Sequence, residues 1–128
     1  MNIRRNPEGV APPGGPYSHP VEGPAGARTL YIAGEVGLLP DGRLAEGIEA
    51  QAEAVWRNFE TILADAGMGI GDLVKITTHL VRPEDLAAAG AARAKHLGEA
   101  RPASATVIVA QLVNPAMPIE IEAVAAKS

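Results

Sequence analysis

The chain has 128 residues, of which 47% are hydrophobic and only 3% aromatic, and its formal net charge is -4 at pH 7. This length fits one domain spanning residues 1–128, with a core built from Ala, Val, Ile and Leu. The acidic balance argues against a nucleic-acid-binding surface, which needs clustered Lys and Arg. The absence of cysteine excludes disulfides, thiolate catalysis and cysteine-ligated zinc. Since we find no signal-type or membrane-spanning apolar run, we expect a soluble cytoplasmic protein that contacts no membrane.

The first third of the chain predicts an arm followed by strands. Residues 1–16 contain four prolines and three glycines, which disfavour a helix or a central strand and predict a surface arm. Residues 17–21 fit a short edge strand, because Pro20 is tolerated only at the edge of a sheet. Residues 29–33 predict a further strand that ends at Gly34.

The clearest helix is predicted over residues 48–66, where apolar side chains recur at spacings of three and four. Gly67 follows at the position where a helix favours a left-handed residue. Residues 74–81 then alternate as a strand, which places His79 on the polar face as a half-buried, hydrogen-bonded side chain rather than a base. A second helix is predicted to open at residues 82–85, with Pro83 near its first turn, and to continue over residues 86–97 to its end at Gly98.

The last quarter predicts two more strands, joined by a turn at Asn114-Pro115. Residues 105–112 are apolar on both faces, so this strand would need cover on two sides. Residues 119–125 alternate, with Glu120 and Glu122 on the face opposite the Ile and Ala side chains. The order β-β-α-β-α-β-β predicts an α+β fold with both helices on one face of a sheet. Because the other face stays uncovered, we expect a homo-oligomer.

The residues alone do not name a reaction. Glu120 and Glu122 could face one cleft or simply line a solvated face, and their spacing leaves both open. The glycines of residues 67–71 follow a helix and therefore predict a loop rather than a dinucleotide site. The three histidines lack metal-ligand spacing, and neither Ser18 nor Ser104 lies in a nucleophile elbow.

Several short segments do occur together in an order typical of one family. They are Gly15-Pro16-Tyr17-Ser18-His19, Ile32-Ala33-Gly34-Glu35-Val36-Gly37, Gln51, Asn58, Ala66-Gly67, Asp72-Leu73-Val74-Lys75, Pro102-Ala103 and residues 119–125. In these segments the chain resembles the Rid family, the reactive intermediate deaminases or YjgF-type proteins. The resemblance implies a chorismate-mutase-like fold, a homotrimer and ligand sites in clefts between subunits.

The resemblance also implies a chemistry, from which this chain departs. The best understood family members hydrolyse amino-acid-derived imines or enamines, and the Arg of a Pro-Ala-Arg motif grips the substrate carboxylate. That position is Ser104 here, the family Ser-Gly-Gln is Ala33-Gly34-Glu35, and the second helix carries Gly90 and Arg93 where Asn and Tyr are usual. A hydroxyl cannot replace a guanidinium clamp, so these changes predict a substrate other than a 2-imino acid. Arg93 and Arg101 are the candidates for a replacement cation.

We therefore expect a hydrolase or deaminase of a small neutral or cationic imine or enamine, with no metal and no organic cofactor. Glu120 is the expected catalytic residue, orienting water or relaying a proton. Ser104 would hold a polar group of the ligand, Tyr17 would close the cleft, and Glu35 could pair with a cationic nitrogen. The remaining expected substrate-binding residues are Gly34, Ala103 and Arg93.

Two other functions remain open at this stage. One is a non-catalytic trimer that binds a small molecule or a partner protein through the same cleft. The other is RNA cleavage, sometimes attributed to this family, against which the acidic charge and the scarcity of aromatic residues argue.

Overall fold

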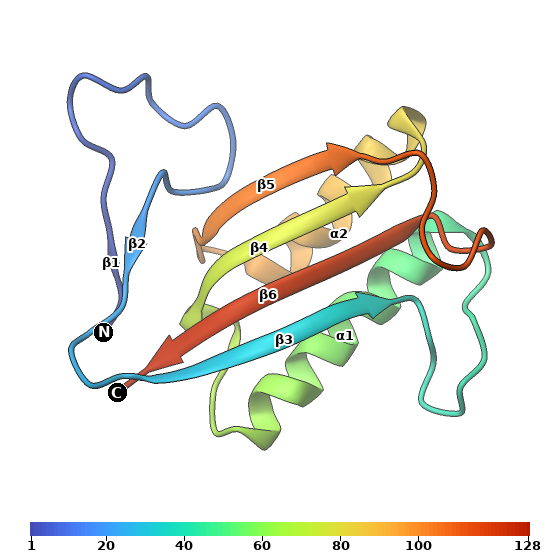
Figure 1. Ribbon diagram of the computed structural model, residues 1–128, viewed down its shortest axis with the longest axis horizontal. Coiled ribbons are helices and arrows are strands. Elements are labelled where there is room, and N and C mark those ends of the chain that lie inside the picture. The colour runs from blue at the N-terminus through green and yellow to red at the C-terminus, as the bar shows by residue number, and fades with distance from the viewer.

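The computed structural model describes residues 1–128 and has two helices packed on one face of a four-stranded sheet (Figure 1). The strands are β3 (Arg28–Val36), β4 (Leu73–Leu80), β5 (Ala103–Ile108) and β6 (Ile119–Lys127), in the order β3-β6-β4-β5. β6 runs antiparallel to β3 and β4, whereas β5 is parallel to β4. Helices α1 (Gly47–Asp65) and α2 (Leu86–Leu97) cover the sheet from behind, which confirms the predicted α+β architecture.

The core forms where the apolar stripe of α1 meets the alternating strands. Trp56 and Phe59 are fully buried and pack edge to face, with ring centroids 5.4 Å apart. They lie among the inward-facing residues of β4 and β6, such as Ile76 and Ile121. The helix ends where predicted, since Gly67 has a φ of 70°, which glycine adopts without strain.

The amino-terminal arm differs from its prediction. No edge strand forms over residues 17–21; β1 (Ile3–Arg4) pairs instead with β2 (Val21–Glu22) in a separate two-stranded sheet. One β-bridge, between Ser18 and Ala103, joins the arm to the edge of the main sheet, and the Asn2 side chain donates to the carbonyl oxygen of Ala126 in β6. The physical reason is that Pro16 and Pro20 flank this bridge and cannot donate ladder hydrogen bonds on either side.

Two strand boundaries also differ. β3 continues past Gly34 to Val36, with a register shift between Ile32 and Glu35 that marks a β-bulge opposite β6. β5 ends at Ile108 rather than at residue 112, because its partner β4 ends at Leu80, which is paired with Ile108. β5 is therefore a short edge strand and not a strand buried on both faces.

No helix covers the outer face of the sheet. Tyr31 is 78% exposed there, and it lines a hollow of about 500 Å³ together with Lys75, Thr77, Glu122 and Val124. In the edge strand β5, Val107, which pairs with His79 on this face, is 42% exposed, and Ile108 at the end of the strand is 44% exposed. An apolar surface of this kind is typical of a protein that associates with another chain.

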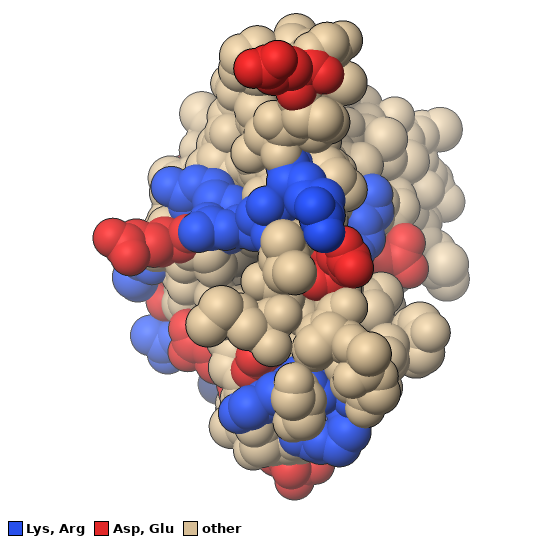
Figure 2. Space-filling view, turned by 90° about the vertical axis from the view of Figure 1, so that its left-hand side faces the viewer, with Lys and Arg blue, Asp and Glu red and all other residues tan.

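The end of the molecule that carries both termini has a mixed charge. Figure 2 shows Lys and Arg gathered there in patches, with Asp and Glu beside them. Near β1 and β2, Arg5 pairs with Glu22 at 2.6 Å and Arg4 donates to the carbonyl oxygen of Glu99. No helix of the structure has the length and apolar character that crossing a membrane requires.

A polar cluster joins the two helices on the side away from the sheet. The ring nitrogens of His96 lie 2.8 Å from a carboxylate oxygen of Glu53 and 2.7 Å from one of Glu60, and the ring stacks on Trp56. Both nitrogens donate only in the imidazolium form. Lys95 also contacts Glu53 at 3.0 Å. These hydrogen bonds, chiefly that from His96, lower the pKa of Glu53 to about 2.

We expect Glu53→Gln to lower the free energy of unfolding at pH 7 by about 1 kcal/mol, the modest size reflecting solvent screening. A carboxyl group whose pKa is depressed by folding stabilises the fold above its unfolded pKa and loses that effect as pH falls. The difference in free energy of unfolding between Glu53→Gln and the unmodified protein should therefore shrink as pH falls from about 4.5 to about 2. Urea unfolding across this pH range measures it. Glu49→Gln on the same helix is the control, and an equal loss in both variants would contradict the prediction.

Candidate functional site

Glu120 lies on the outer face of β6, as the alternation of this strand predicts, and it is half-buried. Its cross-strand neighbour on β4 is His79, whose Nδ1 lies 3.3 Å from the backbone carbonyl oxygen of Glu120. This confirms His79 as a half-buried, hydrogen-bonded side chain. Its contact is to backbone, which leaves the Glu120 carboxylate free for other partners.

The bulge in β3 brings the backbone of Gly34 directly under the side chain of Glu120. A Cβ atom at Gly34 would lie 2.6 Å from Cδ and 2.7 Å from Oε1 of Glu120, closer than real contacts allow. Only glycine therefore permits the carboxylate to rest on β3 in this way. The predicted substrate-binding residue Gly34 thus fixes the position of the predicted catalytic residue.

Glu35 follows immediately in the bulge, and its carboxyl group is partly buried. This burial, and then repulsion from Glu120, raise the pKa of Glu35 above its ordinary value. Two carboxyl groups that repel each other favour either a shared proton or a cation between them. The bulge therefore creates a place where a proton or a positively charged nitrogen is stabilised.

We expect Glu35→Gln to raise the melting temperature at neutral pH. An acid whose pKa is raised by folding destabilises the fold once it ionises, so stability falls as pH rises through that pKa. The gain in melting temperature should vanish below the ordinary pKa of 4.5, where Glu35 is protonated in both the folded and the unfolded protein. Thermal unfolding between pH 4 and pH 8 tests this, with the exposed neighbour Glu122→Gln as control. Identical pH profiles for the two variants would contradict it.

Ser104 lies on the opposite face of the sheet from Glu120. Its partner in β4 is the buried Ile76, so its side chain faces the helices. There, Nη1 of Arg93 on α2 lies 3.4 Å from the Ser104 hydroxyl. Of the two candidates for a replacement cation, Arg93 therefore reaches this region from α2. Arg101, the other candidate, instead donates to the carbonyl oxygens of Gly98 and Ala100.

Tyr17 and Ala103 lie together at the beginning of the edge strand. The bridge between Ser18 and Ala103 holds the arm against β5, and the Tyr17 ring packs edge to face on His19 at 5.9 Å. Tyr17 is half-buried and belongs to no strand, so the arm rather than the sheet places it beside the start of β5.

The predicted residues thus form two groups within one chain. Glu120, Gly34 and Glu35 come together at the β3 bulge, whereas Ser104, Ala103 and Arg93 lie at the β5 edge with Tyr17 close by. Sequence reasoning missed Thr78 and Thr106, which line the cavity beside Arg93. The sequence did offer a signal for Thr78, because it is a polar residue among the apolar residues on the inward face of β4. No group of three or more His, Asp or Glu side chains is arranged to hold a metal ion.

Comparison with known proteins decides the family. The family model described as "Endoribonuclease L-PSP" matches residues 8–127, almost the whole chain. A RutC family protein from Pyrococcus horikoshii is 34% identical over 122 residues, covering 94% of each chain. The solved structure of YyfB from Yersinia pestis, described as a conserved Rid family protein of unknown function, aligns at 35% identity with a TM-score of 0.86, covering 98% of both chains. This chain belongs to the Rid family.

Other Rid relatives carry functional names. Human 2-iminobutanoate/2-iminopropanoate deaminase is 35% identical over 127 residues, covering 96% of this chain and 90% of the human protein. The solved structure of E. coli TdcF with bound serine aligns with a TM-score of 0.74 at 27% identity, covering 89% of this chain and 90% of that one. Rid proteins similar to this chain therefore include imine deaminases and a protein that binds an amino acid.

Proposed function

We propose that this Rid protein is a cytoplasmic hydrolase of a small, reactive imine or enamine, which it converts to a carbonyl compound and ammonia. The observation that carries the proposal is the Glu120 carboxylate, half-buried and resting on Gly34 with Glu35 beside it. The named deaminases among its relatives support the same reaction.

In this reaction the carboxyl pair handles protons. Water adds to the carbon of the C=N bond while Glu120 accepts a proton from that water, and a proton is delivered to nitrogen. The resulting carbinolamine loses ammonia when the hydroxyl group is deprotonated, which forms the C=O bond. Glu35, with its raised pKa, stabilises positive charge on the nitrogen as it becomes a leaving group. Water is the second reactant, so the reaction requires no metal and no organic cofactor.

We further propose that the ligand lies in a cleft between subunits of a homotrimer. Glu120 and Ser104 lie on opposite faces of one sheet, so a single chain cannot present both to one small ligand. A second copy placed against the β5 edge would bring its own Glu120 to the first chain's Ser104. The exposed Tyr31, Val107 and Ile108 would be buried by such contacts. Light scattering should then report about three times the chain mass of 13.2 kDa.

The activity is tested with imines generated in situ by an amino-acid oxidase, alongside imines that lack a carboxylate. The purified protein should accelerate the loss of at least one imine class beyond the rate in buffer, with matching ammonia release. A folded protein that accelerates none of them would refute the proposal. Calorimetric binding without turnover across the same panel would support the non-catalytic ligand-binding trimer instead.

A further inference from the structure

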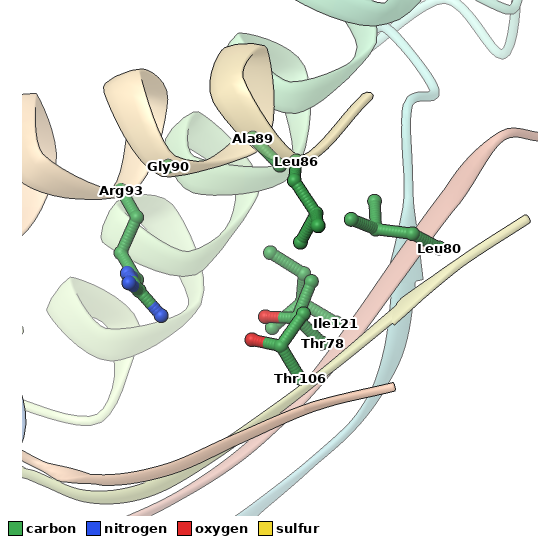
Figure 3. Close-up of a pocket in the computed structure, with 8 residues that line it drawn as sticks. All are labelled: Thr78, Leu80, Leu86, Ala89, Gly90, Arg93, Thr106 and Ile121. Carbon is green, nitrogen blue, oxygen red and sulfur yellow. The ribbon is translucent and has the colours of Figure 1, made fainter. Parts of the chain in front are cut away.

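A small cavity separates α2 from the edge of the sheet (Figure 3). Its volume is about 40 Å³, enough for one or two water-sized groups. Arg93 extends from α2 toward the sheet, and the hydroxyl oxygens of Thr78 and Thr106 lie on the side of the cavity that faces it. Leu80 and Leu86 supply apolar walls. The cavity thus combines one cation and two hydroxyl groups with an apolar lining.

Arg93 lacks the partners that every other arginine in the chain has. The others contact a carboxylate or a backbone carbonyl oxygen, whereas Arg93 contacts only the Ser104 hydroxyl. That contact, at 3.4 Å, is longer than a good hydrogen bond. Its Nε is buried and has no hydrogen-bond partner at all. A buried donor without a partner is costly, so Nε and the weakly paired Nη1 are suited to an acceptor supplied by a ligand.

The cavity is open on the α2 side next to this guanidinium. Gly90 precedes Arg93 by one helical turn and lines the same cavity, and a Cβ atom there would meet nothing within 4 Å. Just beyond Arg93, Lys95 and His96 hold α2 against Glu53 of α1. The backbone that carries Arg93 is therefore held in place beside the cavity.

We propose that Arg93 binds the carboxylate of the substrate in this cavity, supplying from α2 the cation that Ser104 does not provide from β5. A planar carboxylate accepts two parallel hydrogen bonds from a guanidinium, and the threonine hydroxyls can donate to its remaining lone pairs. The cavity has only one cation among its lining residues, which suits a singly charged carboxylate better than a phosphate dianion. Its small size admits the carboxylate while the rest of the ligand extends outward.

This inference deepens the proposed function, on which it rests for the reaction itself. It reverses the prediction of a neutral or cationic substrate, because the substitution at residue 104 relocates the positive charge rather than removing it. The substrate class becomes a small imine or enamine that bears a carboxylate. Glu35 then faces the nitrogen end of the ligand rather than opposing its carboxylate.

Calorimetry tests the inference without any turnover, using pyruvate, its uncharged amide and inorganic phosphate as probes. The unmodified protein should bind pyruvate at least tenfold more tightly than the amide or phosphate. Arg93→Gln should weaken pyruvate binding at least tenfold and leave amide binding unchanged, whereas Arg101→Gln should change neither. Circular dichroism checks that the variants are folded. If Arg93→Gln does not fold, the comparison of pyruvate with the amide and phosphate on the unmodified protein still tests the inference.

The inference is overturned if the unmodified protein binds the amide or phosphate as tightly as pyruvate, or if folded Arg93→Gln retains full pyruvate binding. The proposed function fails separately. Pyruvate binding through Arg93 without turnover of any imine would leave a carboxylate-binding protein that is not a deaminase. Turnover of imines with no preference for a carboxylate would leave a deaminase in which Arg93 has another role.

Discussion

Replacing Glu120 by Gln should lower the rate of imine hydrolysis at least about 100-fold, the usual contribution of a positioned acid or base. Gln has nearly the same shape as Glu and can still rest on Gly34, but it cannot accept a proton from water. The substitution also removes the repulsion between this side chain and Glu35, so the fold should not be weakened. The expected result is a large loss of kcat in a protein that melts at the original temperature or above it.

Steady-state kinetics on the imine that the unmodified protein turns over fastest measure this loss. Glu122→Gln is the matched control, since Glu122 lies two residues along the same face of β6 and is exposed. It should retain nearly full activity. If Glu120→Gln keeps its kcat, the carboxylate does not transfer the proton, and the assignment of Glu120 as the catalytic residue is wrong.

Replacing Gly37 by Ala should have the largest effect on stability, a loss of about 2–3 kcal/mol in the free energy of unfolding. Gly37 is buried just after β3, where the chain passes against the first turns of α1. A Cβ atom there would lie 2.5 Å from Cβ and 2.8 Å from Cα of Gln51. Because one of these atoms is backbone, relief requires the helix to move and cannot come from a side-chain rotation alone.

Urea unfolding measures the loss, and Gly69→Ala provides the control. Gly69 has an extended backbone with φ of -140°, and a Cβ atom there would meet nothing within 4 Å. Its substitution should change the midpoint very little. Equal urea midpoints for the two alanine variants would mean that α1 can shift away from the chain after β3, and that the contact between Gly37 and Gln51 does not limit stability.

The sequence predicted the elements whose signals are local. The periodicity over residues 48–66 corresponds to α1 at Gly47–Asp65. The second helix was predicted to open at residues 82–85, where the structure has a 3-10 turn over Pro83–Asp85, and its predicted continuation corresponds to α2 at Leu86–Leu97. Glycine at residues 67 and 98 marked both helix ends, each with a positive φ. The alternation in β4 and β6 correctly separated inward from outward side chains, including both glutamates of β6.

Features that depend on pairing between distant segments could not be predicted. The apolar run after Ala105 suggested a strand covered on both faces, but the length of β5 is set by where β4 ends. The bulge at Gly34 exists only relative to β6, so no local pattern revealed it. Arg93 and Arg101 were both candidates in the sequence, and the structure brings Arg93 to Ser104 through the packing of α2 against β5, which pairs with β4.

The uncovered face of the sheet has a consequence for how this protein can vary. Its hydrophobic interior lies wholly between the sheet and the helices, so residues on the outer side, such as Tyr31 and Lys75, contribute little to it. In the proposed homotrimer, changes at these positions would alter which chains assemble, and how firmly, while each chain keeps its own fold. Assembly and folding could then be tuned independently, with mixed trimers of related chains governed by a few surface residues.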